Sequence, residues 1–159
     1  MEKHATCKEK KIKVKANIHA YWRDKNGNLL REDHVKNIVT YVGLEKLLKK
    51  AAGETVDDAL INKAALGTGD NTPATSDIAL ETEVYRNNVI SATASDNQLF
   101  IDALFDQGEV DGTFTEFGLF VDGDAGANTG ELWNRVLVNW EKSTEESLFV
   151  RCSFTFTNG

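Results

Sequence analysis

Cysteine and proline are both scarce in this chain, which has two cysteines and one proline among its 159 residues. Cys7 and Cys152 are too few, and too far apart in the sequence, to form the disulfide framework of a small secreted domain. Cys152 falls within an alternating apolar run, where it is expected to be a small buried hydrophobe. The single proline, Pro73, ends a run of turn-forming residues that begins at Gly67. The sequence therefore predicts a fold without covalent cross-links.

Long apolar runs are also missing. No segment reaches the length of a membrane span, and the charged N-terminus lacks the apolar core of a signal peptide. These features predict synthesis in the cytoplasm and no membrane insertion. The formal net charge is −7, and Glu9 interrupts the one basic cluster, at 8–15. Nucleic acid is not expected as a partner, because phosphate binding requires a concentrated positive face.

Hydrophobic periodicity predicts a chain made mainly of β-strands. Residues 1–10 show no periodicity and are predicted to be a flexible tail, whereas 11–159 are predicted to form a single domain. Apolar and polar residues alternate from Ile12 to Trp22, and an Asn-Gly turn leads into a return strand, so 11–38 is predicted to be a hairpin. The remaining strands, between 61 and 157, bring the total to about eight with antiparallel connections.

One segment has helical periodicity instead. An amphipathic helix is predicted over 41–52, with Thr40 as its N-cap and Gly53 just beyond its end. Its apolar face is expected to consist of Leu44, Leu47, Leu48 and Ala51. Such a helix needs a sheet to pack on. The predicted architecture is therefore mainly β, an antiparallel β-sandwich with this helix over an edge or an open end.

Glu116 is the unexpected residue in the strand predicted over 113–121. That strand is dense in apolar side chains on both faces, as expected where little solvent reaches either side. A carboxylate in such a strand has to be paired or hydrogen-bonded. We expect a structural ion pair with Arg86 or Arg135, because a guanidinium can satisfy both carboxylate oxygens.

Motifs that carry known chemistry are missing from the sequence. Nothing matches a P-loop, a dinucleotide-binding fingerprint, a nucleophile elbow or a zinc spacing. The glycine-rich run at 67–72 has no lysine to meet a phosphate, so a tight turn is expected there. A carboxylate hydrolase using Glu116 with Asp102 or Asp106 is the enzymatic alternative. The prediction is a protein that is not an enzyme, with no catalytic residues, cofactor or metal.

Two further residue groups have a binding interpretation beside a structural one. His19 and His34 can meet across the first hairpin, either as exposed polar neighbours, which is the preferred interpretation, or as a metal pair. Asp122, Asp124 and Asn128 have roughly the spacing of a calcium loop. No glutamate stands at the twelfth position of that loop and no helices flank it, so an exposed loop tip is the expected structure.

Four aromatic residues are predicted to be interface or ligand contacts: Tyr21, Trp22, Trp133 and Trp140. Tyr21 and Trp22 are adjacent in a strand and face opposite sides, so at least one is expected to meet solvent or a partner. Trp133 and Trp140 also differ in parity. In a binding-module interpretation, Trp133 and the loops at 67–77 and 122–130 form a shallow sugar site.

Five short motifs occur in one order over roughly residues 35–156. They are Asn37-Ile38-Val39-Thr40 with Gly43, Ala65 to Gly69 with Pro73, Ser76, Asp77 and Leu80, Glu81 to Arg86, Thr115 to Phe120, and Gly130 to Arg135. In this order they resemble a family of small tail-associated structural proteins of tailed bacteriophages. The resemblance implies a virion subunit with a β-sandwich core, located near tail fibres, collar or baseplate. It assigns no catalytic residues.

The sequence and this resemblance together lead us to expect a virion structural protein of the phage tail or another particle surface. Its expected partners are other virion proteins and further copies of itself in a homo-oligomer. The alternatives are a receptor- or carbohydrate-binding module that attaches to a host surface, and a capsid-surface decoration protein. The hairpin at 11–36 matches the shared pattern least, and its charged face is a candidate attachment arm.

Overall fold

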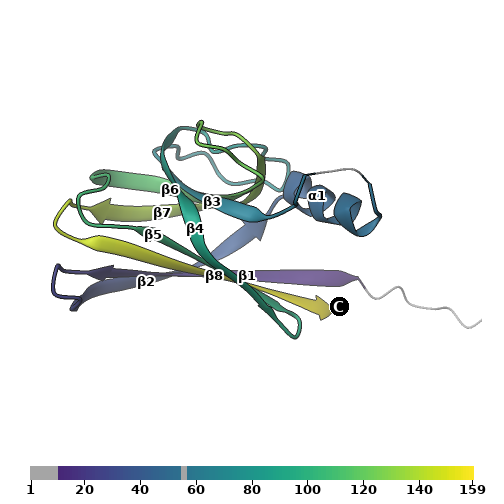
Figure 1. Ribbon diagram of the computed structural model, residues 1–159, viewed down its shortest axis with the longest axis horizontal. Helices are drawn as coiled ribbons and strands as arrows, with labels where there is room; N and C mark the ends of the chain where they lie inside the picture. Colours follow the sequence, from purple (N-terminus) through teal and green to yellow (C-terminus); the bar gives the residue numbers. More distant parts are fainter. Residues whose placement is uncertain (1–10, 55–56) are drawn as a thin grey trace, which may run out of the picture.

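The computed structural model describes residues 11–54 and 57–159, which form eight antiparallel strands and one helix (Figure 1). The elements are β1 (Ile12–Arg23), β2 (Leu29–Val39), α1 (Tyr41–Ala51), β3 (Ile61–Gly67), β4 (Glu83–Ser95), β5 (Gln98–Phe105), β6 (Gly112–Val121), β7 (Glu131–Lys142) and β8 (Ser147–Asn158). The mainly β class, the first hairpin and the helix are as predicted. The tail predicted over 1–10 lies outside the described residues.

The strands close into a barrel in the order β1-β2-β7-β6-β3-β4-β5-β8, with β8 paired to β1. The predicted β-sandwich is therefore corrected to a barrel, because β2 and β4 each pair with strands of both sheets. β2 pairs with β1 along most of its length and reaches β7 only at Ile38 and Val39. β4 pairs with β3 up to Asn88 and with β5 from Val89, and the register shifts between Val89 and Ser91. Strands that change sheets at such irregularities form the corners of a barrel.

The barrel interior holds one apolar core with large aromatic side chains. Trp22 and Trp140 meet edge to face with ring centroids 5.8 Å apart, and Trp133 meets Phe154 in the same way at 5.4 Å. Such contacts between aromatic edges and faces are favourable beyond the area they bury. Cys152 is fully buried in this core, as its place in an alternating strand predicted.

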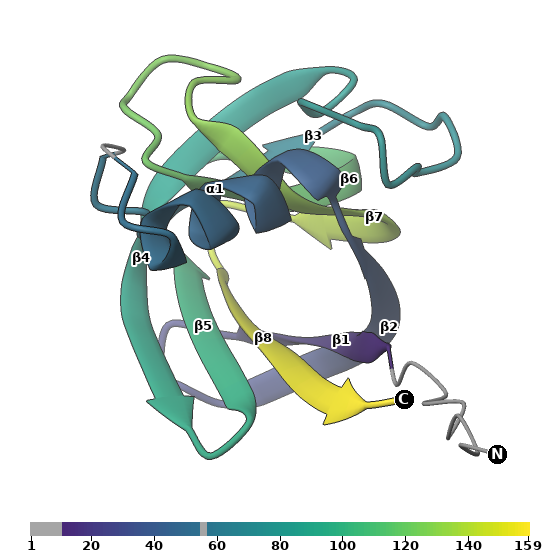
Figure 2. The same ribbon diagram turned by 90° about the vertical axis from the view of Figure 1, so that its right-hand side faces the viewer.

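Helix α1 lies across one end of the barrel (Figure 2). Thr40 is its N-cap, and the Thr40 hydroxyl accepts a hydrogen bond from the Gly43 amide at 3.4 Å. A Cβ atom on Gly43 would lie only 2.7 Å from the Cα of Trp133, so glycine lets the first turn approach β7. No helix in residues 11–54 or 57–159 has both the length and the apolar character that crossing a membrane requires.

The predicted apolar face of the helix is only partly correct. Leu44 and Leu47 pack against the core, but Leu48 is 69% exposed and Ala51 is exposed as well. The helix covers only part of the barrel end (Figure 2). The apolar spacing therefore predicted the helix and overestimated how much of it is covered.

A second layer covers the outer face of β3, β6 and β7. It consists of the segments at 68–82 and 122–130, which run outside the barrel wall (Figure 1). A small apolar cluster fills the space beneath them and contains Ala65, Leu80, Phe120 and Leu132, with Val42 packed against it. Both faces of β6 are therefore covered, which explains its nearly continuous apolar sequence.

Candidate functional site

The buried ion pair between Glu116 and Arg135 is the centre of this outer layer. Glu116 is fully buried, Arg135 is 3% exposed, and Glu116 Oε2 lies 2.7 Å from Arg135 Nε. The same carboxylate accepts hydrogen bonds from the amides of Gly69 at 3.0 Å, Thr82 at 2.7 Å and Glu81 at 3.0 Å. Of the two predicted partners of Glu116, Arg135 is therefore the correct one.

These contacts keep Glu116 ionised inside the protein. Burial alone would raise the pKa of the Glu116 carboxyl, because the charged form loses its hydration. The hydrogen bond from the Thr82 amide and the bond from Arg135 outweigh that effect, together with the amides of Glu81 and Gly69, so the pKa lies below its ordinary value. A carboxylate whose oxygens are all engaged in this way serves to hold backbone in place.

Arg135 extends the network to the segment at 68–82. Its Nη1 lies 3.1 Å from Asp77 Oδ2, and its Nη2 lies 3.5 Å from Glu81 Oε2. The guanidinium thus joins β7 to two points of the covering segment, while Glu116 joins β6 to its two ends. Hydrogen bonds between charged groups are stronger than those between neutral groups.

The glycines at 67–72 have a spatial role in this network. A Cβ atom on Gly67 would lie 2.5 Å from Glu116 Oε1, and one on Gly69 would lie 2.7 Å from the same oxygen. Only glycine lets the backbone come close enough to donate to the buried carboxylate. The glycine-rich run, which was predicted only as a tight turn, therefore brings the backbone close to Glu116.

Arg86 holds the other covering segment, at 122–130. It pairs with Glu83 at 2.6 and 3.0 Å, and its Nη1 donates to the carbonyl oxygens of Asp124 at 3.0 Å and Thr129 at 3.2 Å. Its guanidinium also lies 4.6 Å from the centroid of the Phe120 ring. Arg86 as a partner of Glu116 was a wrong prediction, because Glu83, on its own strand, takes that position.

The possible calcium ligands have separate partners. The Asp122 carboxylate accepts from the amides of Ala59 at 3.0 Å and Leu60 at 3.1 Å, whereas Asp124 accepts from the amide of Gly126 at 2.9 Å. Asp122 thereby fixes the chain entering β3, and Asp124 shapes its own loop. Within the described ranges, no three or more histidine, cysteine, aspartate or glutamate side chains are grouped to hold a metal ion.

The two aspartates of the enzymatic alternative also have partners other than Glu116. Asp102 on β5 forms a two-pronged pair with Arg151 at 2.8 and 2.7 Å. Asp106 accepts from the amide of Gln107 at 2.8 Å. Neither forms a hydrogen bond with Glu116 among the described residues, so the structure does not assemble the acid and base that this alternative requires.

The three tryptophans are interior residues, which corrects the prediction that they contact a partner. Trp22 is 2%, Trp133 0% and Trp140 1% exposed. Trp133 and Trp140 face the same side of β7 despite their different parity, because the register of β7 with β6 shifts between Leu119 and Phe120. One extra residue in a strand reverses which side the following side chains face, so Trp133 and Trp140 both point inward.

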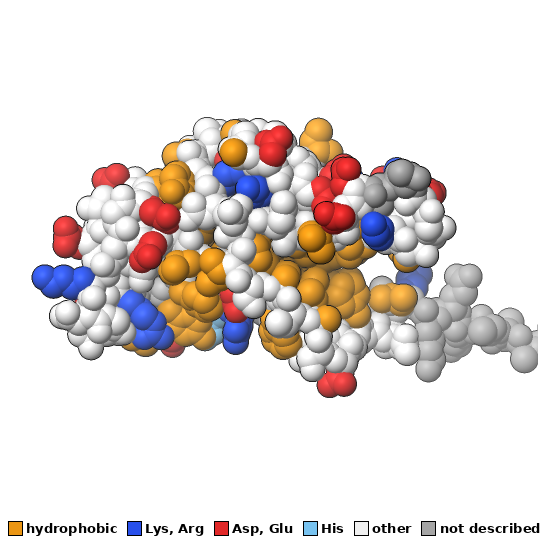
Figure 3. Space-filling model, viewed as in Figure 1, with side chains coloured by type: hydrophobic (Ala, Val, Ile, Leu, Met, Phe, Trp, Pro, Cys, Tyr) orange, Lys and Arg blue, Asp and Glu red, His pale blue; other side chains and the backbone are white. Residues whose placement is uncertain are grey.

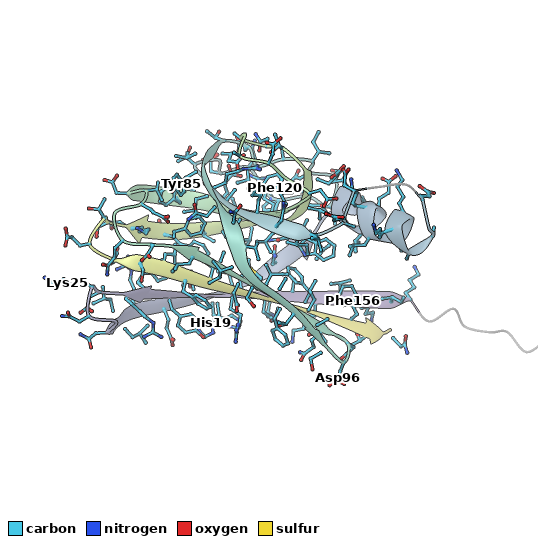
Figure 4. All side chains as sticks on the ribbon, in the orientation of Figure 1. His19, Lys25, Tyr85, Asp96, Phe120 and Phe156 are labelled. Carbon is cyan, nitrogen blue, oxygen red and sulfur yellow. The ribbon has the colours of Figure 1, made fainter. Side chains whose placement is uncertain are left out.

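Tyr21 is the one predicted aromatic contact that reaches the surface. It is half-buried on the outer side of β1, where His19 also lies (Figure 4), and its hydroxyl is 2.9 Å from His19 Nδ1. His19 is in register with His34, as expected for cross-strand neighbours, with ring centroids 5.4 Å apart. A groove of about 350 Å³ runs past these rings. It is lined by Lys15, Asn17, His19, Tyr21, His34, Phe100, Arg151 and Ser153.

The structure contains a buried lysine that was not predicted from the sequence. Lys142 is 1% exposed, and its Nζ donates to the carbonyl oxygens of Asp106 at 2.9 Å, Glu109 at 3.1 Å, Val110 at 3.2 Å and Ser143 at 3.1 Å. Burial lowers the pKa of this ammonium, although nearby carboxylates act in the opposite direction. The one available signal was its parity, since Lys142 faces the same side as Trp140.

Comparison of the chain with protein-family models, with curated proteins and with solved structures finds no match.

Proposed function

We propose that this protein is a structural subunit of a tailed-bacteriophage particle, associated with the tail and acting through contacts with other proteins. The observation that supports it best is the meeting of the five motifs that resemble the virion family. Thr40 donates its amide to the carbonyl of Trp133 at 3.0 Å, and the Glu116 network joins Gly69 and Glu81 to Arg135. The five motifs are thus connected to one another by hydrogen bonds in the folded chain.

The hydrogen bonds among the motifs give the shared residues a structural role. The shared residues form a helix cap, close backbone approaches and ion pairs. Among them, Glu116 and Arg135 hold the segment at 68–82, and Arg86 holds the segment at 122–130. A rigid, loop-covered barrel suits a building block that has to keep its shape within an assembly. The motif residues therefore explain why the resemblance extends over the fold without defining a reactive centre.

Locating the protein in particles tests the proposal. Mass spectrometry of purified particles of the phage that encodes it should detect the chain in stoichiometric amounts, and immunogold labelling should mark the tail. Labelling of the head would instead support the decoration alternative. Particles that lack the chain, from cells in which it is expressed and folded, would contradict a virion role.

A second candidate function is the binding of a glycan on the groove beside Tyr21. This groove combines ring faces of Tyr21, His19 and Phe100 with hydrogen-bonding groups on Asn17 and Ser153. Sugars bind to such surfaces by stacking on a ring while polar groups bond their hydroxyls. This site replaces the one predicted around Trp133, which is buried.

A glycan array with wild-type protein and Tyr21→Ala tests this candidate. Tyr41→Ala is a matched control, because Tyr41 is 65% exposed on the helix and away from the groove residues. Binding that is lost in Tyr21→Ala and kept in Tyr41→Ala is the expected result. Equal binding by all three proteins would place the glycan elsewhere.

A further inference from the structure

We infer that the free edge of β4, residues 89–95, pairs with the same segment of a second copy of the chain, so that two barrels join about a twofold axis. The inference rests on the proposed function, since it names a subunit contact for a structural protein. It identifies both the surface and its occupant.

The edge exists because β4 changes partners in its middle. Asn88 is the last residue of β4 in register with β3, and Val89 is the first in register with β5. Beyond Asn88, the side of β4 that faced β3 has no strand beside it among the residues described. Figure 2 shows β4 as the outermost strand on that side of the barrel. In an antiparallel pair, every second residue of such an edge points its N–H and C=O groups outward, where they can bond another strand.

The composition of this edge is unusual for the chain. Residues 89–95 read Val-Ile-Ser-Ala-Thr-Ala-Ser, with no charge and no proline, although 27% of the sequence is charged. Natural proteins usually guard an exposed edge with lysine, proline or a cover. The segment instead has small and β-branched residues that suit pairing with another strand.

At the other places where neighbouring strands of the barrel are unpaired, charges or side-chain hydrogen bonds protect the free strand edge. At the start of β1, before its pairing with β2 begins at Ala16, Lys13 and Lys15 supply charges. Between β2 and β7, Trp22 Nε1 and the Arg31 guanidinium both donate to the carbonyl of Glu141.

The far side of the same corner is guarded as well. Along the first half of β4, Asn87 Nδ2 donates to the carbonyl of Leu104 at 2.9 Å and fills the gap beside β5. The second half of β4 has no comparable guard, because no side chain in the described residues is hydrogen-bonded to Ile90 through Ser95.

Exposed apolar side chains lie beside this edge. Ile90 is 57% and Leu60 59% exposed, and both line a hollow of about 430 Å³ between the start of β3 and β4. Hydrophobic side chains gather on the face that β4 crosses (Figure 3). The hairpin turn at Asp96 projects away from the body (Figure 4), so the end of this edge nearest the turn is open to an incoming strand. Added pairing would cover apolar surface that is now in water.

A second copy fits this edge because the segment is complementary to itself. An axis at Ala92 places Ile90 opposite the partner's Ala94, and Ser91 opposite the partner's Thr93. The same surface then serves both subunits, as a twofold contact requires. Two proteins with a net charge of −7 repel each other, but this strand brings no like charges face to face.

Lysine on the edge tests the inference. Thr93→Lys puts like charges across the axis, whereas Thr113→Lys adds the same charge at an exposed position of β6. Sedimentation velocity over a series of concentrations should show dimers for the wild type and Thr113→Lys, and monomers for Thr93→Lys. Circular dichroism should show all three folded. A wild type that is monomeric throughout the series, or a Thr93→Lys variant that dimerises like the wild type, overturns the inference.

Cross-linking tests the register. In a Cys7→Ser background, Ala92→Cys should form a disulfide-linked dimer under mild oxidation, because an axis at residue 92 brings the two sulfurs together. Thr113→Cys in the same background is the control, and buried Cys152 is common to both. Equal cross-linking of both variants overturns the proposed axis. Finding the chain in particles while the dimer tests fail would contradict this contact alone, whereas its absence from particles would contradict the virion role alone.

Discussion

Glu116 and Arg135 lie diagonally across two neighbouring strands, since Glu116 is in register with Leu137 and Arg135 with Gly118. Their 2.7 Å contact crosses the β6–β7 ladder on its outer face and is covered by the segment at 68–82. The pair therefore holds two strands and the covering segment together, and its removal should affect all three.

Glu116→Gln should lower the free energy of unfolding by about 3 kcal/mol, because it leaves the Arg135 charge buried without its main partner. Urea denaturation monitored by tryptophan fluorescence measures the change. Glu45→Gln is the matched control, since it breaks the exposed helix pair with Lys49 and such pairs contribute little. Equal effects of the two substitutions would contradict a central role for the buried pair.

Acid should destabilise the protein partly through Glu116. Burial raises the pKa of this carboxyl, but the Thr82 amide and Arg135 bring it below the ordinary value of 4.5. The unfolded chain then takes up the proton first, so the stabilisation is fully present above pH 4.5 and is lost as the pH falls through the lower folded pKa. Unfolding free energies measured at successive pH values should fall more steeply below that point in the wild type than in Glu116→Gln. Parallel curves would show that other carboxyls account for the acid sensitivity.

Gly43→Ala should destabilise the protein, although alanine normally favours a helix over glycine by about 1 kcal/mol. Its Cβ would lie 2.7 Å from Trp133 Cα and 2.8 Å from the carbonyl oxygen of Leu132, both backbone atoms that cannot turn aside. Overpacking of this kind costs about 1–3 kcal/mol. Thermal unfolding measures the result, with Leu48→Ala on the exposed helix face as the control. A stabilised Gly43→Ala protein would show that α1 can move away from β7.

Trp140→Phe should cost more stability than Trp133→Phe, although both indoles are buried. Trp140 Nε1 donates to Asp33 Oδ2 at 2.8 Å, whereas Trp133 Nε1 has no hydrogen-bond partner in the part of the chain that the structure describes. Replacement by phenylalanine removes a bond to a carboxylate at one site and an unsatisfied donor at the other. We expect a difference of about 1–2 kcal/mol in urea denaturation. The reverse order would indicate that Trp133 Nε1 finds a partner in solution.

The alternation and spacing of residues in the sequence predicted the features that depend on residues close together in the chain. The hairpin from Ile12, the helix capped by Thr40 and the need of Glu116 for a cation all follow from spacing and burial rules. These features are set by a few adjacent positions, or by a charge that cannot remain alone in an apolar strand.

Features that depend on register were not predictable in this way. The barrel closes because β2 and β4 each pair with strands of both sheets. Apolar and polar residues would alternate in the same way along these strands in a sandwich. The tryptophans were misplaced because a register shift at Leu119 reverses parity without a mark in the sequence. The burial of Lys142 was not predictable from spacing, because the four carbonyl oxygens around its Nζ are brought together only by the fold.

The contact between β2 and β7 has a consequence for how the molecule deforms. Only the pairs Ile38–Arg135 and Val39–Asn134 join these two strands, far fewer than join any other neighbours in the ring. Thermal opening should therefore begin there, splitting the ring while β4 still acts as a hinge between its halves. The opened form would resemble two stacked sheets. In this chain the barrel therefore differs from a sandwich by the two residue pairs between β2 and β7.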